Sequence, residues 1–66
     1  MKEYDIVKLN RDLPEKKLKK GIKGAIVMVF NEPDSPLAYE VEFVNNDGET
    51  IAIETIRKEY LDLVNK

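Results

Sequence analysis

Hydrophobic positions along the chain fall into short runs separated by turn-forming residues, a pattern typical of a small β-sheet protein. The first run, residues 4–9, is rich in β-branched side chains. The second, residues 24–30, is the most apolar, and seven residues are too few for a buried helix. In residues 39–43 apolar and acidic side chains alternate strictly. This alternation predicts a strand whose apolar side chains face a core and whose two glutamates face water.

The alternation resumes in residues 50–54, after a strong hairpin-turn signal at Asp47-Gly48. It predicts that Ile51 and Ile53 share one face of the strand. We expect the outer face of this hairpin to carry the nearby acidic residues, namely Glu40, Glu42, Glu49 and Glu54.

Residues 55–64 fit two structures. Ile56, Tyr60, Leu63 and Val64 have the spacing of an amphipathic helix, but residues 60–64 could equally form a short closing strand after a tight turn. We favour the strand, because closure of the sheet would remove its exposed edges.

The segment between the first two runs, residues 10–23, is rich in turn formers and lysine, and Pro14 pushes Leu13 toward extended geometry. We expect a long exposed loop pinned by Leu13 and Leu18. Together these elements predict an all-β fold in one domain, residues 1–66. It is a small five-stranded antiparallel barrel with a long loop after the first strand and a short 3-10 turn or helix near the C-terminus.

The amino-acid composition excludes several kinds of catalytic and metal-binding site. The 66 residues contain no Cys and no His, which excludes disulfides, thiol nucleophiles, Ser–His catalysis and the commonest metal ligand. Paired carboxylates could act as acid and base, but a barrel this small fills its interior with its own side chains. We therefore expect no enzyme activity, no cofactor and no metal. No apolar run approaches the length of a membrane span and no signal-peptide pattern opens the chain, so we expect a cytoplasmic protein with no membrane partner.

Charge is distributed unevenly around a formal net charge of −2. Residues 1–23 hold eight basic and four acidic side chains, whereas residues 24–56 hold seven acidic ones and no Lys or Arg. Nucleic-acid binding depends on a basic surface that displaces counterions from phosphates, and the acidic middle of the chain opposes it. The sequence therefore favours a protein partner over a nucleic acid.

The basic residues between the first two strands form the candidate partner-binding site: Arg11, Lys16, Lys17, Lys19, Lys20 and Lys23. These side chains could receive an acidic protein surface or a phosphate backbone. The alternative is a solvated loop whose charge serves only solubility.

Two short motifs have structural rather than functional interpretations. Gly21-x-x-Gly24 resembles the backbone clamp of KH domains, but there the loop joins two helices, whereas here the second glycine opens a strand. We expect a tight turn and a close backbone approach. Asn45 to Glu54 partly matches a calcium loop, but Phe43 would occupy the first ligand position and cannot coordinate, so a plain hairpin is favoured.

Several blocks in fixed order resemble the DUF4926 family over about residues 5–63. The blocks are Asp5-Ile6-Val7-x-Leu9, Asp12-Leu13-Pro14, Leu18-Lys19-x-Gly21-x-x-Gly24-x-x-Val27, Tyr39-Glu40-Val41-Glu42-Phe43 and Gly48-x-Thr50. DUF4926 proteins are short bacterial proteins with no assigned function. The Gly21-x-x-Gly24 pattern, which leads into the hydrophobic second strand, is also similar to KOW-type and other SH3-like barrels. The resemblance therefore implies an SH3-like barrel and no particular activity.

Two function hypotheses follow. The first is a non-enzymatic protein-interaction module, such as an immunity protein, an antitoxin or a small regulatory subunit that binds one protein partner. Its segregated charge would steer a complementary surface. The alternative is a KOW-like nucleic-acid-binding or ribosome-associated module that uses the lysine-rich loop, and its binding would weaken steeply with salt. The oligomeric state stays open.

Overall fold

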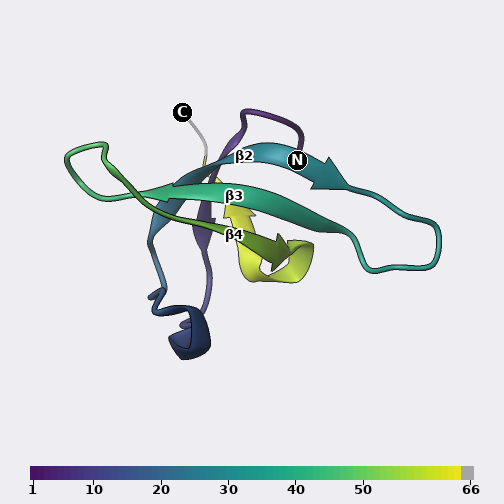
Figure 1. Ribbon diagram of the computed structural model, residues 1–66, viewed down its shortest axis with the longest axis horizontal. Helices are drawn as coiled ribbons and strands as arrows, with labels where there is room; N and C mark the ends of the chain where they lie inside the picture. Colours follow the sequence, from purple (N-terminus) through teal and green to yellow (C-terminus); the bar gives the residue numbers. More distant parts are fainter. Residues whose placement is uncertain (65–66) are drawn as a thin grey trace.

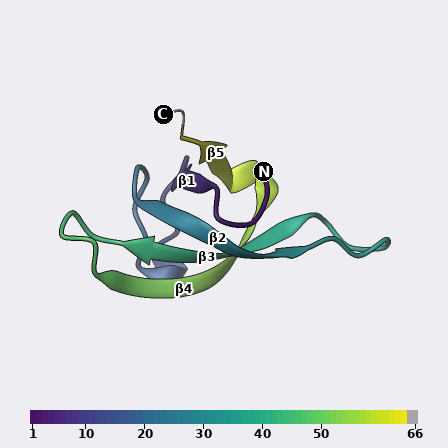
Figure 2. The ribbon, with the colours of Figure 1, turned by 90° about the horizontal axis from the view of Figure 1, so that it is seen from above.

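The computed structural model describes residues 1–64 as one antiparallel sheet of five strands with two 3-10 turns (Figures 1 and 2). The all-β prediction is confirmed, as are the long loop after the first strand and the 3-10 turn near the C-terminus. In chain order the elements are β1 Ile6–Leu9, η1 Pro14–Lys16, β2 Lys23–Phe30, β3 Ala38–Val44, β4 Thr50–Arg57, η2 Lys58–Tyr60 and β5 Leu61–Leu63.

The sheet is open. Its strand order is β4-β3-β2-β1-β5, and β4 and β5 are the two edges (Figure 2). The short η2 turn carries the chain from β4 to the far side of the sheet, where β5 pairs with β1 through Leu61 opposite Leu9 and Leu63 opposite Val7. The predicted closure into a barrel therefore does not occur, and an SH3-like barrel is not confirmed.

The hydrophobic core lies on one side of the sheet. The alternation in β3 holds, since Tyr39, Val41 and Phe43 are fully buried. The rest of the core is aliphatic and comes from the other four strands and the long loop: Val7, Leu9, Leu13, Leu18, Ile26, Ile56 and Leu61. Burial of large apolar side chains supplies the main driving force for folding such a small domain.

The long loop between β1 and β2 is fixed to this core. Leu13 and Leu18 are buried and face each other in an isolated bridge, in which each amide donates to the other residue's carbonyl at 2.8 and 3.1 Å. The η1 turn lies between them. The predicted pinning of the loop by these two leucines is confirmed.

The C-terminal segment is a 3-10 turn followed by a strand, so the favoured alternative is confirmed. Leu61 is buried in the core, and the ladder with β1 continues to Val64, whose amide donates to the Ile6 carbonyl at 2.9 Å.

The orientation of β4 differs from the sequence-based prediction. Thr50 lies opposite Val44, but Phe43 lies opposite Ala52, so one extra residue is accommodated in β4 between these pairs. This bulge reverses the alternation, because one added residue moves every following side chain to the other face. Ile53 consequently lies opposite Glu42 on the outer face, and both Ile51 and Ile53 are exposed.

Glu54 lies on the side of the sheet opposite to the one predicted. It lies opposite the buried Val41, on the core side of the sheet. The prediction that Glu54 shares the outer face with Glu40 and Glu42 is therefore wrong, and the same bulge is the reason.

The glycines and the hairpin turn behave as predicted. Gly24 lies within β2, where a Cβ would fall 2.7 Å from the Glu42 carbonyl oxygen, and Gly21 adopts a φ of +93° in the preceding turn. Residues 45–49 form a tight hairpin turn in which Asn45 donates to the Glu49 carbonyl and Gly48 has a φ of +81°. Both motifs are thus structural.

Candidate interaction surfaces

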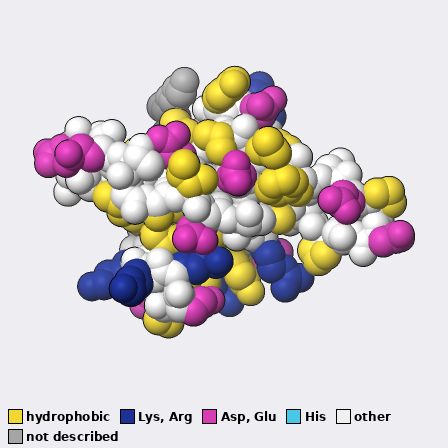
Figure 3. Space-filling model, viewed as in Figure 1, with side chains coloured by type: hydrophobic (Ala, Val, Ile, Leu, Met, Phe, Trp, Pro, Cys, Tyr) yellow, Lys and Arg dark blue, Asp and Glu magenta, His cyan; other side chains and the backbone are white. Residues whose placement is uncertain are grey.

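The predicted basic site lies on the long loop and the first residue of β2. We call Arg11, Lys16, Lys17, Lys19, Lys20 and Lys23 the basic loop, and all of its side chains are exposed or half-buried. Figure 3 shows Lys and Arg side chains gathered around η1, below the sheet in this view. The structure therefore brings most of this charge together on one side of the molecule, on a segment fixed by the two buried leucines.

Two members of the basic loop are engaged within the chain. The Lys16 ammonium lies 3.3 Å from a carboxylate oxygen of Glu54, and the Arg11 guanidinium lies 4.3 Å from the centre of the Tyr60 ring. Within residues 1–64, Lys17, Lys19 and Lys20 make no salt bridge. These three lysines are exposed on a loop that Leu13 and Leu18 hold against the core, and their amines could contact an acidic or phosphate-bearing surface.

The Lys16–Glu54 pair should contribute little stability. Both side chains are about one-third exposed, and ion pairs of this exposure are worth about 0–1 kcal/mol because solvent screens them. We expect Glu54→Gln to lower the free energy of unfolding by less than about 1 kcal/mol. Urea denaturation of both proteins measures this difference, and a loss of several kcal/mol would show that the pair is far better shielded than its exposure indicates.

A second surface covers the side of the sheet away from the core. One row of paired residues crosses four strands in the order Ile6, Ala25, Glu42 and Ile53, and the next row runs from Met28 through Glu40 to Thr55. We call these seven residues the outer face. Its three large apolar side chains are exposed: Ile6 at 39%, Met28 at 48% and Ile53 at 55%. Ile51 adds a fourth exposed aliphatic side chain beside it.

Two carboxylates lie among these apolar side chains. Figure 3 shows acidic groups set within a hydrophobic surface over β2, β3 and β4. Glu42 accepts a hydrogen bond from the Thr50 hydroxyl, and within residues 1–64 neither Glu40 nor Glu42 forms a salt bridge. No Lys or Arg occurs between residues 24 and 56. The outer face is therefore both apolar and negatively charged.

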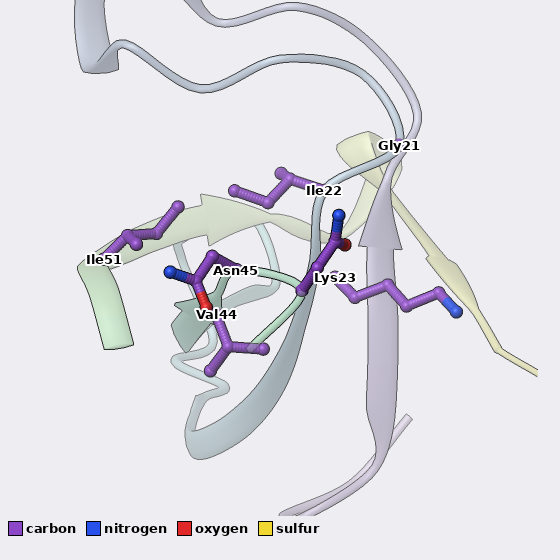
Figure 4. A pocket seen from close by; sticks show the side chains of 7 residues that line it. Gly21, Ile22, Lys23, Val44, Asn45 and Ile51 are labelled. Carbon is purple, nitrogen blue, oxygen red and sulfur yellow. The ribbon is translucent and has the colours of Figure 1, made fainter. Parts of the chain in front are cut away.

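An open hollow of about 490 Å³ lies where the segment before β2 meets the β3–β4 turn (Figure 4). It is lined by Gly21, Ile22, Lys23, Val44, Asn45, Asn46 and Ile51. Both polar ends of Asn45 are occupied within the turn, since its amide donates to Glu49 and its oxygen accepts from the amides of Asp47 and Glu49. Lys23 and Asn46 remain as the other polar groups of the lining.

The described residues contain no cluster of three or more side chains suited to hold a metal ion. Across residues 1–64, no helix has the length and apolar character needed to span a membrane. Both observations concern only this part of the chain, and the expectations of no enzyme activity and no cofactor stay predictions.

A protein-family model matches nearly the whole chain. The model of DUF4926, a domain of unknown function, matches residues 3–63. The chain belongs to the DUF4926 family. The resemblance inferred from the ordered sequence blocks is thereby confirmed. No curated protein and no solved structure matches this DUF4926 chain.

Sequence reasoning located the basic loop but missed the outer face. The apolar run of β2 gave no indication that Met28 points away from the core, because every residue around it is also apolar. The sequence pattern predicts a regular alternation that includes Ile51 and Ile53, and the bulge in β4 interrupts it.

Proposed function

We propose that this DUF4926 chain is a non-enzymatic protein-interaction module that binds one protein partner through the outer face. The exposure of Ile6, Met28 and Ile53 around Glu40 and Glu42 carries this proposal. Exposed apolar side chains gathered on one face of a sheet are a common mark of a contact surface.

The partner surface that fits the outer face is apolar with basic side chains. Burial of apolar area contributes roughly 25 cal/mol per Å² removed from water, which favours contact over Met28 and Ile53. Covering Glu40 and Glu42 with an uncharged surface would leave two desolvated carboxylates without a cation, which is strongly unfavourable. An Arg or Lys of the partner beside these carboxylates removes that penalty and selects the partner.

This mode of binding suits an immunity protein, an antitoxin or a small regulatory subunit, each of which recognises a single protein. An SH3-like arrangement of the strands, with the sheet open between β4 and β5, stays part of the proposal. It is supported by five antiparallel strands in the order β4-β3-β2-β1-β5 and by a 3-10 turn before the last strand.

The basic loop supports a second candidate, a KOW-like nucleic-acid or ribosome-associated module. Lys17, Lys19 and Lys20 project from a segment that Leu13 and Leu18 hold in place, so the basic surface is formed before binding. The same loop could instead contact an acidic region of the protein partner. Nucleic-acid binding would be lost on nuclease treatment and would weaken steeply with salt.

A matched pair of variants tests the proposal. Met28 on the outer face and Leu63 on β5 are exposed to nearly the same extent, 48% and 47%, but Leu63 lies opposite Val7 rather than on the outer face. Tagged wild type, Met28→Lys and Leu63→Lys are used to capture partners from cytosol after nuclease treatment, at low and moderate salt. We expect wild type and Leu63→Lys to retain the same protein and Met28→Lys to lose it.

Two outcomes would contradict the proposal. Retention of the protein by Met28→Lys would show that the outer face is not the contact. Loss of all binding on nuclease treatment would favour the nucleic-acid candidate and direct mutation to the basic loop.

A further inference from the structure

The edge strand β4 offers backbone groups that nothing within residues 1–64 pairs with. β4 spans eight residues and forms one end of the sheet, as Figure 2 shows. The other edge, β5, has only three residues, and short edge strands are a common protection against pairing with another chain. β4 lacks this protection.

The pairing register identifies which backbone groups of β4 face outward. The Lys58 amide donates to the Leu37 carbonyl, immediately beyond the pair Ala38–Arg57. Because hydrogen-bonded and non-hydrogen-bonded pairs alternate along an antiparallel ladder, Ile56 and Glu54 direct their amide and carbonyl groups toward β3. Those of Thr55 and Ile53 point away from the sheet.

Apart from the bulge at Ile51 and the terminal Arg57, β4 also lacks the usual barriers to edge pairing. Residues 50–56 contain no Pro, Lys or Arg, and Ile51 and Ile53 are exposed. The single charge in this stretch, Glu54, lies on the core side and is paired with Lys16 at 3.3 Å. An inward charge normally discourages a second strand, but here the lysine compensates it.

We propose that β4 pairs with β4 of a second copy of this chain, antiparallel and centred on Ile53. The two copies of Ile53 would exchange two N–H···O bonds across a twofold axis, and Ile51 of each copy would lie opposite Thr55 of the other. Two exposed β-branched side chains of each copy would thereby gain apolar cross-strand contacts. A twofold arrangement closes on itself, so it yields a dimer rather than a fibre.

Charge selects this register over its neighbours. Centring on Glu54 would set the two glutamates directly opposite each other, which is destabilising. Centring on Thr55 would shift Ile51 out of the ladder and leave it exposed. With Ile53 at the centre, Glu54 lies opposite Ala52 of the second copy. Arg57, whose Nε lies 3.5 Å from a carboxylate oxygen of Glu59 in its own chain, approaches the beginning of the other β4, where Glu49 precedes it. Opposite charges therefore meet at both ends of the paired strands.

The dimer is expected to be a weak one. A ladder of so few residues buries less area than a standard stable interface, so the equilibrium should depend on concentration in solution. The dimer would place two outer faces side by side on a continuous sheet. The dimer and the proposed partner would share Ile53, but the dimer does not need Met28, which lies two strands away from the paired edge.

Single cysteines test the register, since the chain has none of its own. Directly opposed residues of a hydrogen-bonded antiparallel pair have Cα atoms about 5.5 Å apart, within the range of about 4.4–6.8 Å that a disulfide spans. Under mild oxidation we expect Ile53→Cys to form covalent dimers roughly tenfold faster or more than Met28→Cys, because pairing raises the effective concentration of the thiols. Equal rates for these two exposed positions would overturn the proposal.

Sedimentation velocity over a range of concentrations provides a second readout without cysteines. We expect wild type and Met28→Lys to shift from monomer to dimer as concentration rises, and Ile53→Lys to stay monomeric with an unchanged melting temperature. A wild type that stays monomeric at every concentration, or an Ile53→Lys variant that dimerises like wild type, would overturn the proposal. Because Met28→Lys removes the partner in one experiment and leaves the dimer in this one, failure of either idea is distinguishable from failure of the other.

Discussion

Phe43→Ala is expected to lower the free energy of unfolding by about 3–5 kcal/mol, the typical cost of removing a buried aromatic ring and leaving a cavity. Phe43 is fully buried near the middle of the sheet, paired with Gly24 on one side and Ala52 on the other. Both neighbours are small, so neither can fill the space that the ring leaves. For a domain whose total stability is on the order of 5 kcal/mol, this loss should leave little folded protein at room temperature.

Urea denaturation followed by circular dichroism measures this loss, with Glu40→Ala as the matched control on the same strand. Glu40 points to the outer face, so its truncation should change the stability by less than about 0.5 kcal/mol. A large loss for Glu40→Ala with a small one for Phe43→Ala would mean that the register of β3 is displaced by one residue.

Gly24→Ala is expected to be the most damaging addition of a single methyl group to this fold. The new Cβ would lie 2.7 Å from both the Glu42 carbonyl oxygen and Cγ1 of Val41. The carbonyl belongs to the backbone of β3 and cannot turn aside, so the strands must separate locally. Overpacking of this kind costs about 1–3 kcal/mol, and we expect a value near the upper end.

Gly21→Ala is the informative comparison for this substitution. Apart from Gly21 and its two chain neighbours, no residue has an atom within 4 Å of a Cβ at this position, so the cost of about 1 kcal/mol arises only from a φ of +93°. Thermal melts rank the two variants, and amide chemical shifts of β3 report the strand displacement directly. If Gly24→Ala left the β3 shifts unchanged while Gly21→Ala moved them, the close approach of β2 and β3 would be contradicted.

The predictability of this fold differs between strands for physical reasons. The pattern in residues 39–43 determines which side chains are buried, because each apolar residue alternates with a polar one. The apolar stretch of β2 carries no such contrast, so its bulge between Ile26 and Met28 has no counterpart in the hydrophobic pattern. Closure of the sheet depends on where η2 directs the last strand, a long-range property that local spacing does not encode.

One of the two candidate surfaces could be predicted from the sequence and the other could not. The basic loop could be predicted because its lysines are adjacent in the sequence and its two leucines stand out among charged residues. The outer face could not, because Ile6, Met28 and Ile53 come from three different strands and can be assigned to one face only when the register of the sheet is known. The bulge in β4 then decides that Ile53, rather than Ala52, joins them.

Site-specific photo-crosslinking in cells tests the central claim, that the outer face holds a protein partner. A benzophenone amino acid replaces Met28 in one strain and Leu63 in another, and both are irradiated and analysed by mass spectrometry. The account predicts one discrete, nuclease-resistant protein adduct from position 28 and none from position 63. Equal labelling at both positions, or no protein adduct at position 28, would contradict it.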